Sequence, residues 1–220
     1  QYMLNKIFDL NENFLNYYKT YNFHNLYKEL LNFCTVDLSA FYFDIRKDTL
    51  YCDTKDSEKR KNTILLLNII LDCLLKWFAP ILSFTTEEIY RLLFKDNKSI
   101  HLEKFIDFPN TFANEKLYQK WLELIKIRNI CNISIEEKRA NKEIGSSLEA
   151  DLNIQLDQKL EEITKNIDFS ELCITSKAEI SFKENLETSA QTKKAKGTKC
   201  TLCWKISEKA CDRNHCPKNT

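Results

Sequence analysis

The sequence has 220 residues, 43% of them hydrophobic, which is enough for one large domain or two modest ones with a real core. With 33 basic and 32 acidic residues, the whole molecule has no field that would draw it to a polyanion, so affinity for nucleic acid must come from a local patch. The two glycines, Gly145 and Gly197, lie far apart, which excludes a Gly-x-Gly-x-x-Gly turn and a P-loop because both need closely spaced glycines.

Helical periodicity dominates the first two-thirds of the chain. Apolar residues recur at intervals of three and four, which predicts helices over residues 1–20, 22–47, 58–78 and 114–139. The polar stretch 48–57 is expected to be a connection. Thr85 and Glu88 have the spacing of a capping box, so a short helix is expected to begin at Thr85. Together these helices predict an antiparallel bundle over residues 1–147.

The most apolar stretch, residues 64–82, is not expected to span a membrane. Asn68, Asp72 and Lys76 interrupt it at intervals of four, which places them in one polar stripe along a helix. The pattern is typical of a core helix with one hydrated edge, because a membrane span needs about 20 predominantly apolar residues. Pro80 is expected to end or kink this helix.

After the bundle, the spacing of apolar residues changes from the helical interval of three to four to strict alternation. Leu152, Ile154 and Leu156 alternate with polar residues, which predicts a half-buried strand. A short helix and two more short strands are expected to follow, over residues 160–167, 172–175 and 178–182. These elements predict a small α/β junction domain over residues 148–185.

A polar stretch separates this domain from the end of the chain. Residues 186–198 have Leu186 as their single large apolar residue, so we expect a flexible linker. The terminal module is expected to comprise residues 199–220.

The nine cysteines fall into two groups. The first group stands singly among apolar residues, where a thiol behaves as a small hydrophobe, so these cysteines are expected to be buried and reduced. They are Cys34, Cys52, Cys73, Cys131 and Cys173. The other four lie in "KGTKCTLCWKISEKACDRNHC", residues 196–216.

The clustered cysteines predict a metal site. Cys200 and Cys203 are spaced Cys-x-x-Cys, and Cys211 and Cys216 follow after a short loop. Two thiolates from each of two turns match tetrahedral zinc coordination, and four protein ligands close the site, so we expect one structural zinc ion. His215 is an alternative fourth ligand. A redox pair is the less favoured interpretation, since such a pair normally begins a helix in a thioredoxin-like fold, and disulfides are not expected in a cytosolic chain.

Lysines and a tryptophan surround the cysteines. No acidic residue occurs between residues 191 and 205. This composition fits a surface that contacts phosphates and stacks on bases, but it fits equally a solvated linker with the tryptophan packed on the knuckle. The residues concerned are Lys193, Lys194, Lys196, Lys199, Lys205 and Trp204.

Several motifs, in the same order along the chain, resemble the C-terminal part of bacterial-type isoleucyl-tRNA synthetases. "FHNLYKELLNFCTVDLSAFYFDIRKDTLYCD" resembles that family's second bundle helix, and "FAPILSFTTEEIY" its proline-interrupted segment. "WLELIKIRNICNISIEEKRANKEIGSSLEADL" resembles the helix and turn that lead into its small domain, and the cysteine knuckle with Trp204 resembles its terminal zinc module. The resemblance covers essentially the whole chain.

The resemblance implies the fold class and the role. The fold is mainly α: an antiparallel helix bundle of the anticodon-binding type, followed by a small α/β junction domain and a C-terminal zinc knuckle. The family's catalytic and editing domains are missing, since no His-x-Gly-His-type motif and no Lys-Met-Ser-Lys-Ser-type loop occurs. The chain opens on Gln1 and is expected to be a fragment of a ligase, without catalytic residues and unable by itself to bind ATP.

The resemblance also assigns candidate tRNA contacts. Trp204 is implied to stack at the anticodon, and Arg128, Arg139 and Lys142 match basic positions of the family. A structural interpretation of these three cations is that they pair with nearby glutamates. Gly145 is expected to supply a backbone conformation that other residues avoid.

Two positions depart from the family's pattern. Leu202 stands where the family commonly has an arginine thought to reach the anticodon, so that contact is lost or moved to Lys199 or Lys205. The second cysteine pair, Cys211 and Cys216, is spaced Cys-x4-Cys instead of the Cys-x-x-Cys usual in the family, so the identity of one metal ligand is not assigned.

The leading hypothesis is a cytoplasmic, monomeric fragment of isoleucine–tRNA ligase that binds the anticodon arm of an isoleucine tRNA. Its other partners would be the catalytic and editing domains of the parent chain, with no membrane involved. The competing hypothesis is a zinc-stapled helical protein-interaction module with no RNA role.

Overall fold

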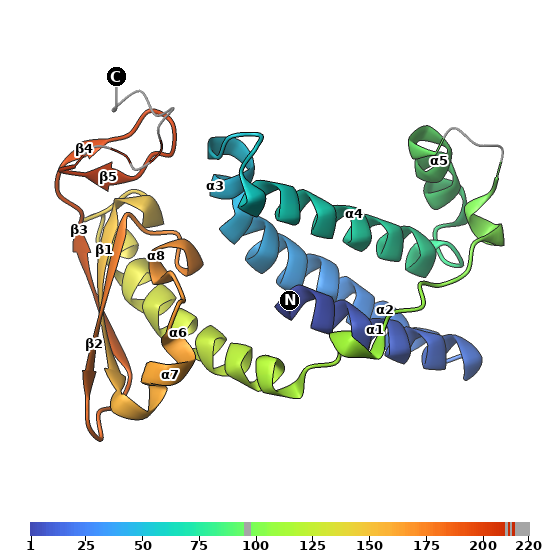
Figure 1. The fold of residues 1–220 in the computed structure, drawn as a ribbon, viewed down its shortest axis with the longest axis horizontal. Helices are drawn as coiled ribbons and strands as arrows, with labels where there is room; N and C mark the ends of the chain where they lie inside the picture. Colours follow the sequence, from blue (N-terminus) through green and yellow to red (C-terminus); the bar gives the residue numbers. More distant parts are fainter. Residues whose placement is uncertain (95–97, 210, 212, 214–220) are drawn as a thin grey trace. The chain divides into compact units, whose positions relative to one another are not determined.

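The computed structural model describes residues 1–94, 98–209, 211 and 213, and Figure 1 shows the elements along the chain. The chain divides into two compact units. Unit 1 consists of Gln1–Tyr42 and Lys55–Tyr118, and unit 2 of Phe43–Thr54 and Gln119–Thr220. Residues 43–54 and 119–147 belong to the same unit as the sheet that follows, and the domain boundary after residue 147 stays a prediction.

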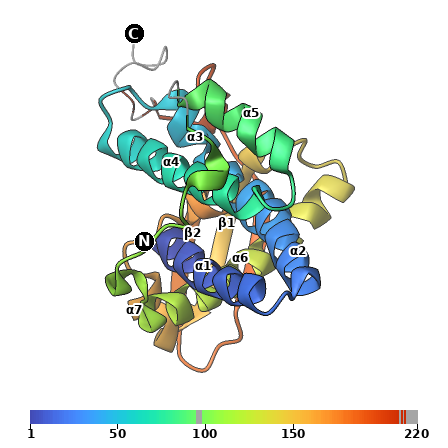
Figure 2. The ribbon, with the colours of Figure 1, turned by 90° about the vertical axis from the view of Figure 1, so that its right-hand side faces the viewer.

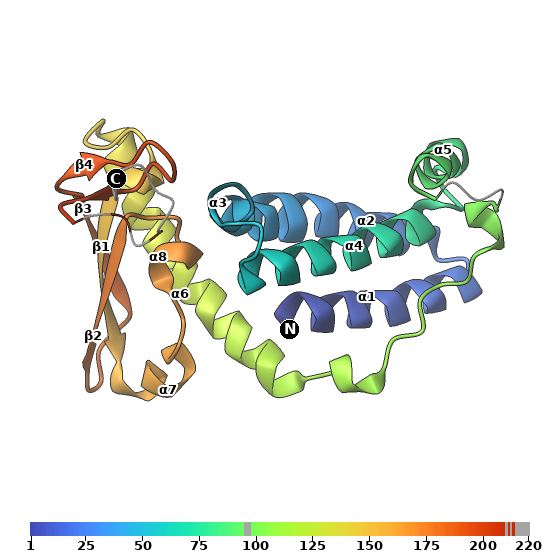
Figure 3. The same ribbon diagram turned by 45° about the horizontal axis from the view of Figure 1, so that its top comes forward.

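Unit 1 is helical. α1 (Tyr2–Lys19) contacts α2 (Phe23–Asn32) and α4 (Glu58–Phe78), and Figure 3 shows these three helices side by side. α5 (Ser83–Leu93) contacts α4, as Figure 2 shows from another side. The predicted helices over residues 1–20 and 58–78 are confirmed. Two 3-10 helices complete the unit, Ile100–Leu102 and Asn110–Phe112.

Trp77 lies at the centre of the unit 1 core. Its ring is 1% exposed and packs edge-on against Phe14, with the ring centroids 4.9 Å apart. The indole Nε1 donates to Asn11 Oδ1 at 3.0 Å, and the Tyr18 hydroxyl donates to the Trp77 carbonyl oxygen at 2.7 Å. A buried indole N–H needs a hydrogen-bond acceptor. Asn11, which is itself 1% exposed, provides that acceptor inside the core.

The second helical segment is longer than predicted. α2 continues through a π-helical stretch, Phe33–Phe43, into α3 (Asp44–Cys52). The predicted end at residue 47 and the connection over 48–57 are therefore wrong in part. Thr49 and Cys52 are buried and extend the apolar stripe of this segment at intervals of four and three from Ile45, which keeps the backbone helical despite the polar neighbours.

α5 begins two residues before the predicted start. Its N-cap is Leu82, which makes no capping bond with its side chain. Thr85 is therefore not the cap residue, and the capping-box prediction is wrong. Thr86 instead donates its hydroxyl to the Leu82 carbonyl oxygen at 3.0 Å, inside the first turn.

The polar stripe on α4 is present as expected. Asn68 is exposed, and Lys76 forms an i,i+4 ion pair with Asp72 at 2.9 Å. Among the described residues, no helix is long and apolar enough to cross a membrane.

Unit 2 is built on a three-stranded sheet with strand order β2-β1-β3. The central strand pairs in parallel with β2 and antiparallel with β3. On β1, Leu152, Ile154 and Leu156 are buried, which confirms the predicted strand. The strands are β1 (Ala150–Asp157), β2 (Lys177–Lys183) and β3 (Ser189–Lys194), and two short helices, α7 (Glu161–Thr164) and α8 (Phe169–Leu172), connect β1 to β2.

The long helix α6 (Glu115–Ala140) covers one face of this sheet, as Figure 1 shows. Its helix prediction over residues 114–139 is confirmed. The Ser134 hydroxyl lies 2.8 Å from the Thr192 hydroxyl on β3 and joins helix to sheet. Four side chains at helical spacing form its buried face: Leu124, Ile127, Cys131 and Ile135.

Two expectations about this region are wrong. Residues 172–175 are not a strand, because α8 ends at Leu172 and the chain turns through Ile174, whose φ is 57°. Residues 186–198 are not simply a flexible linker, since β3 within them pairs with β1 over six residues. The sequence of β3, SAQTKK, lacks an alternation of apolar and polar residues. Its strand conformation is instead held by backbone hydrogen bonds to the edge of β1, which a side-chain pattern cannot predict.

The isolated cysteines are free thiols, as predicted. Cys52, Cys73, Cys131 and Cys173 are buried, and Cys34 is half-buried. Their burial agrees with the small-hydrophobe interpretation.

Candidate metal centre and nucleic-acid interface

The Cys-x-x-Cys motif lies in the turn of a short β-hairpin, which we call the cysteine hairpin (residues 198–207). Strand β4 (Thr198–Lys199) pairs antiparallel with β5 (Ile206–Ser207). The Cys200 N–H donates to the Lys205 carbonyl oxygen at 2.8 Å, and the Trp204 N–H donates to the Cys200 carbonyl oxygen at 3.0 Å. These bonds close a tight turn in which Trp204 takes a left-handed conformation, with φ of 62°.

Gly197 allows the hairpin to close. Its φ is +117°, and a Cβ built on it would lie 2.2 Å from the carbonyl carbon of Ser207. Any side chain at this position would therefore collide with the backbone of β5. The prediction that Gly145 has the special conformation is wrong: Gly145 does not have a positive φ, and Lys142, with φ of 58°, takes the left-handed position at the end of α6.

Three thiols converge at the hairpin. The Sγ atoms of Cys200, Cys203 and Cys211 all lie within 4.8 Å of one another. Cys200 and Cys203 are 2% and 7% exposed, and Cys211 is half-buried. The Leu202 N–H points to Cys200 Sγ, with an N–S distance of 3.4 Å. A sulfur that accepts a backbone N–H is suited to carry the negative charge of a metal thiolate.

The chemistry of these thiols fits a soft or borderline cation. Burial raises the pKa of Cys203 to about 12, and the neighbouring Cys200 and Cys211 add to the rise. Burial therefore opposes the ionisation of Cys203 unless a cation lies beside it. Thiolate ligands at this spacing are those of structural zinc sites.

Both candidates for the predicted fourth ligand lie outside the described residues. Cys216 and its alternative, His215, are both in that part of the chain. The choice between them stays a prediction. The redox interpretation loses its structural basis, because Cys200 and Cys203 lie in a hairpin turn and not at the start of a helix.

Two contacts that the sequence did not reveal anchor this region to α3. Arg213 forms ion pairs through Nη2 with Asp48 at 2.5 Å and through Nε with Asp53 at 3.0 Å. Cys52 donates its thiol to the Leu202 carbonyl oxygen at 3.4 Å. Burial and the nearby Asp48 raise the pKa of Cys52 to about 11, so it stays a protonated donor. No sequence signal links residues so far apart in the chain.

A third contact anchors the hairpin to the sheet. The Ile206 N–H donates to Ser176 Oγ at 2.6 Å, and Ser176 in turn donates to the Leu148 carbonyl oxygen. The hairpin is therefore held from α3 on one side and from the start of the sheet on the other.

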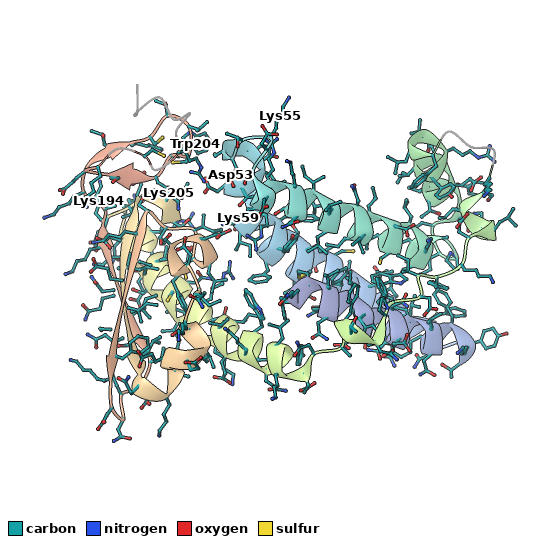
Figure 4. All side chains as sticks on the ribbon, in the orientation of Figure 1. Asp53, Lys55, Lys59, Lys194, Trp204 and Lys205 are labelled. Atoms are coloured by element: carbon teal, nitrogen blue, oxygen red, sulfur yellow. The ribbon has the colours of Figure 1, made fainter. Side chains whose placement is uncertain are left out.

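The predicted nucleic-acid residues around the hairpin are presented at the surface. Trp204 is 60% exposed, which favours presentation at the surface over packing on the knuckle. Lys199 Nζ lies 5.7 Å from the centroid of its ring, within cation–π range. Figure 4 shows Trp204 and Lys205 on the hairpin and Lys194 at the end of β3. Lys205 is half-buried, and the other four lysines of this stretch are exposed: Lys193, Lys194, Lys196 and Lys199.

The candidate cations of α6 have local partners. Arg128 is half-buried, and its Nε donates to the Leu172 carbonyl oxygen at 2.9 Å, which ties α6 to α8. Arg139 pairs with Glu136 at 2.6 Å. The Arg139 pair agrees with the structural interpretation, whereas Arg128 binds a backbone carbonyl oxygen instead of a glutamate. Lys142 is exposed next to the end of α6. The structure therefore groups Trp204 with the hairpin lysines and does not bring Arg128 to the surface with them.

The chain is similar to parts of known tRNA ligases. Residues 1–156 match the family model described as the anticodon-binding domain of tRNA ligase. The isoleucine–tRNA ligase of Pelagibacter ubique is 63% identical over 214 residues, which cover 97% of this chain and 24% of that protein. Those of Agrobacterium fabrum and Bartonella henselae are 36% and 35% identical, over 93% and 94% of this chain and 22% of each protein. The chain thus spans about a quarter of the length of these curated relatives.

Proposed function

The chain belongs to the family of anticodon-binding domains of tRNA ligases, and on that premise we propose that it binds the anticodon arm of a tRNA as the C-terminal part of an isoleucine–tRNA ligase. The identity to isoleucine–tRNA ligases across nearly the whole chain supports the choice of amino acid. Aminoacylation itself, and the binding of ATP, belong in this proposal to the catalytic domain of the parent chain.

The presentation of Trp204 supports the proposal most directly. An exposed indole with Lys199 over its ring offers one surface for a base and one charge for a phosphate. Proteins bind the unstacked bases of single-stranded RNA loops by stacking them on aromatic side chains, with cations along the backbone. An anticodon loop presents both.

A single zinc ion would have a structural role. Its ligands would be the thiolates of Cys200, Cys203 and Cys211 and a fourth group from Cys216 or His215. Bound zinc would cross-link these segments of the chain and leave no coordination position open for a substrate. The residues of the hairpin would orient Trp204, Lys199 and Lys205 toward the RNA. We further propose a cytoplasmic monomer.

The protein-interaction alternative has less support. It would leave the family match and the exposed Trp204 without a role. Salt dependence separates the two functions, because log affinity for RNA falls linearly with log salt in proportion to the phosphates contacted.

The test is a titration of the zinc-loaded chain with isoleucine and valine tRNAs, repeated after chelation. Tighter, zinc-dependent binding of the isoleucine tRNA is expected, with a salt-dependent affinity. The Cys203→Ser variant should lose zinc and bind this tRNA more weakly, whereas Cys34→Ser, which changes a cysteine of unit 1, should behave as wild type. Absence of binding to either tRNA would overturn the proposed function.

A further inference from the structure

Helix α5 of unit 1 carries apolar side chains on two opposite faces. Its inner face packs on the end of α4, where Tyr90 is 6% exposed and clusters with Leu75 and Ile100, and Figure 1 shows α5 at this end of α4. Phe84 and Leu92 lie on the outer face and are 92% and 74% exposed. A helix with apolar residues on opposite faces is normally buried on both, so the described residues of unit 1 leave one face of α5 without a cover.

A second segment extends this outer face. Residues 99–102 are held against α5 because Glu87 accepts hydrogen bonds from the Ser99 hydroxyl at 2.8 Å and from the Ile100 N–H at 3.0 Å. The His101 ring donates from Nε2 to the Ser83 carbonyl oxygen at 3.2 Å, at the first residue of α5. Leu102, the next residue, is 80% exposed.

We call this region the α5 surface. Single exposed apolar side chains are normal on a protein, but several large ones on one helix and the turn held against it are typical of an interaction site. The hydrogen bonds of Glu87 and His101 fix the two segments to each other, so the surface is formed before a partner binds. Its exposed apolar side chains are Leu82, Phe84, Ile89, Leu92 and Leu102.

The charges of α5 indicate the class of partner. The helix carries two carboxylates, Glu87 and Glu88, and one cation, Arg91. Arg91 pairs with Glu87 at 2.7 Å, so the helix has no surplus positive charge to offer a polyanion. RNA and anionic membranes are bound through clustered lysines and arginines. The α5 surface therefore fits an apolar protein surface and neither of these.

The family supplies the polypeptide that such a surface needs. This chain covers 24% of the Pelagibacter ubique ligase, so that ligase is about four times as long as the matching part. A chain of that length folds as several domains, because a single hydrophobic core stops growing beyond about 250–300 residues. Domains of one chain meet through interfaces of about 600–1,500 Å². An uncovered apolar face on a domain of such a protein is suited to pack on a neighbouring domain.

We propose that the α5 surface is the docking surface for the catalytic domain of the parent ligase, which packs an apolar patch of its own against Phe84, Leu92 and Leu102. This inference rests on the proposed function, which assigns a catalytic domain to the parent chain, and adds the surface on which unit 1 holds it. Each large apolar side chain buried there strengthens docking by roughly 10- to 150-fold, the free energy of its burial converted to an equilibrium constant.

The experiment compares two proteins by hydroxyl-radical footprinting, which labels exposed side chains and is read by mass spectrometry. One is the isolated zinc-loaded chain. The other is the Pelagibacter ubique ligase with this chain in place of the 214 residues that it matches, a replacement that 63% identity makes conservative. Labelling of Phe84, Leu92 and Leu102 should fall several-fold in the whole ligase. Labelling of Trp204, which the proposed function assigns to RNA, should be the same in both without tRNA.

Substitutions on the outer face separate docking from folding. Phe84→Ser combined with Leu92→Ser should leave the circular dichroism and the urea midpoint of the isolated chain unchanged, because both positions are exposed. In the whole ligase, the same pair should return the labelling of Leu102 to its level in the isolated chain. Ile133→Ser is the matched control, since Ile133 is 62% exposed on α6, and it should leave Leu102 protected.

Three results would overturn the docking proposal. Equal labelling of the α5 surface in the isolated chain and in the whole ligase would show that the parent chain does not cover it. Protection that grows with the concentration of the isolated chain would assign the surface to a second copy. Protection of the isolated chain by added tRNA would assign it to RNA.

Two further measurements keep the outcomes distinct. If the hybrid ligase does not fold, footprinting of the unaltered Pelagibacter ubique ligase at the residues aligned with Phe84 and Leu92 replaces it, and strong labelling there overturns the proposal. Binding of tRNA by the isolated chain is measured separately. If the chain binds tRNA while the α5 surface stays exposed in the whole ligase, docking fails and the proposed function stands.

Discussion

The sheet core and the cysteine hairpin belong to the same unit, but different forces hold them. On β1, Leu152, Ile154 and Leu156 are at most 1% exposed, and α6 covers them with its own apolar face. The hairpin has two strands of two residues each, and within its described residues the buried side chains are Cys200 and Cys203. The first region folds by burial of apolar surface, whereas the second has too little of it to fold in that way.

This difference sets the scale of the expected effects. Burying a large aliphatic side chain is worth about 1.5–3 kcal/mol. A structural zinc ion contributes about 10–16 kcal/mol in small modules near neutral pH. If the proposed zinc ion is bound, the hairpin should depend on it for most of its stability, and the sheet core should not depend on it at all.

The largest expected effect is the loss of the metal. Cys203→Ser removes one of three converging thiols, so zinc stoichiometry should fall from one to near zero and trypsin should cleave rapidly at the lysines between residues 193 and 209. The helical circular dichroism signal should remain. Loss of that signal would show that the hairpin is part of the main core, which would contradict the independence of the sheet core from the metal. Cys34→Ser serves as the control.

The next effect is on the sheet core. Leu152→Ala creates a cavity under α6 and should lower the free energy of unfolding by about 2–5 kcal/mol in urea titrations. Ile133→Ala, at a 62% exposed position of α6, should change it by less than about 0.5 kcal/mol. The Leu152→Ala loss should be the same with zinc and after chelation. If the loss of unfolding free energy disappears on chelation, the sheet core and the hairpin unfold as one cooperative element.

A smaller effect tests the backbone of the hairpin. Gly197→Ala places a Cβ against the Ser207 carbonyl group at a left-handed φ, which costs about 1–3 kcal/mol. Zinc affinity should fall by roughly 5- to 150-fold in competition with a chelator, because the strands no longer close the turn. Gly145→Ala is the matched control, since its nearest contact would be 3.4 Å from the flexible end of Glu149. Equal affinities for both variants would contradict the role of Gly197.

The smallest effect concerns the N-cap of α8. Asp168 accepts from the Ser170 and Glu171 N–H groups at 2.8 and 3.2 Å. Asp168→Ala should cost about 1 kcal/mol of unfolding free energy at neutral pH. Burial alone would raise the pKa of Asp168, but the hydrogen bond from the Ser170 hydroxyl, the two backbone hydrogen bonds and the charge of Lys205 outweigh it and lower the pKa.

The direction of that shift fixes the pH dependence. A carboxyl with a lowered pKa stabilises the fold above its unfolded-state pKa of about 3.9, and the stabilisation is lost as pH falls through the lower folded-state value. The difference between wild type and Asp168→Ala should therefore be constant from about pH 7 to about pH 5 and shrink below about pH 4. Asp168→Asn retains a capping side chain and should remove this pH dependence. A difference that grows toward low pH would contradict the assignment.

Local periodicity was sufficient for much of the fold. The helices over residues 1–20 and 58–78 and the strand of Leu152, Ile154 and Leu156 follow from apolar spacing within one element. The motif order also gave the family, which the family match confirms. β3 was missed because its backbone pairs with β1 while its side chains are polar, and α5 was placed two residues late because a capping-box spacing is a weak signal without its surroundings.

By itself, the sequence determined the helical class and the family, and it predicted a metal set of which Cys200, Cys203 and Cys211 converge in the structure; each depends on residue types at short spacing. Tertiary structure alone decided that Cys52 of α3 bonds to the hairpin, that Arg213 pairs with Asp48 and Asp53, and that Tyr51 and Trp204 line one pocket. Contacts between residues so distant in the chain leave no periodic trace, because they depend on how separate elements pack and not on any pattern within one of them.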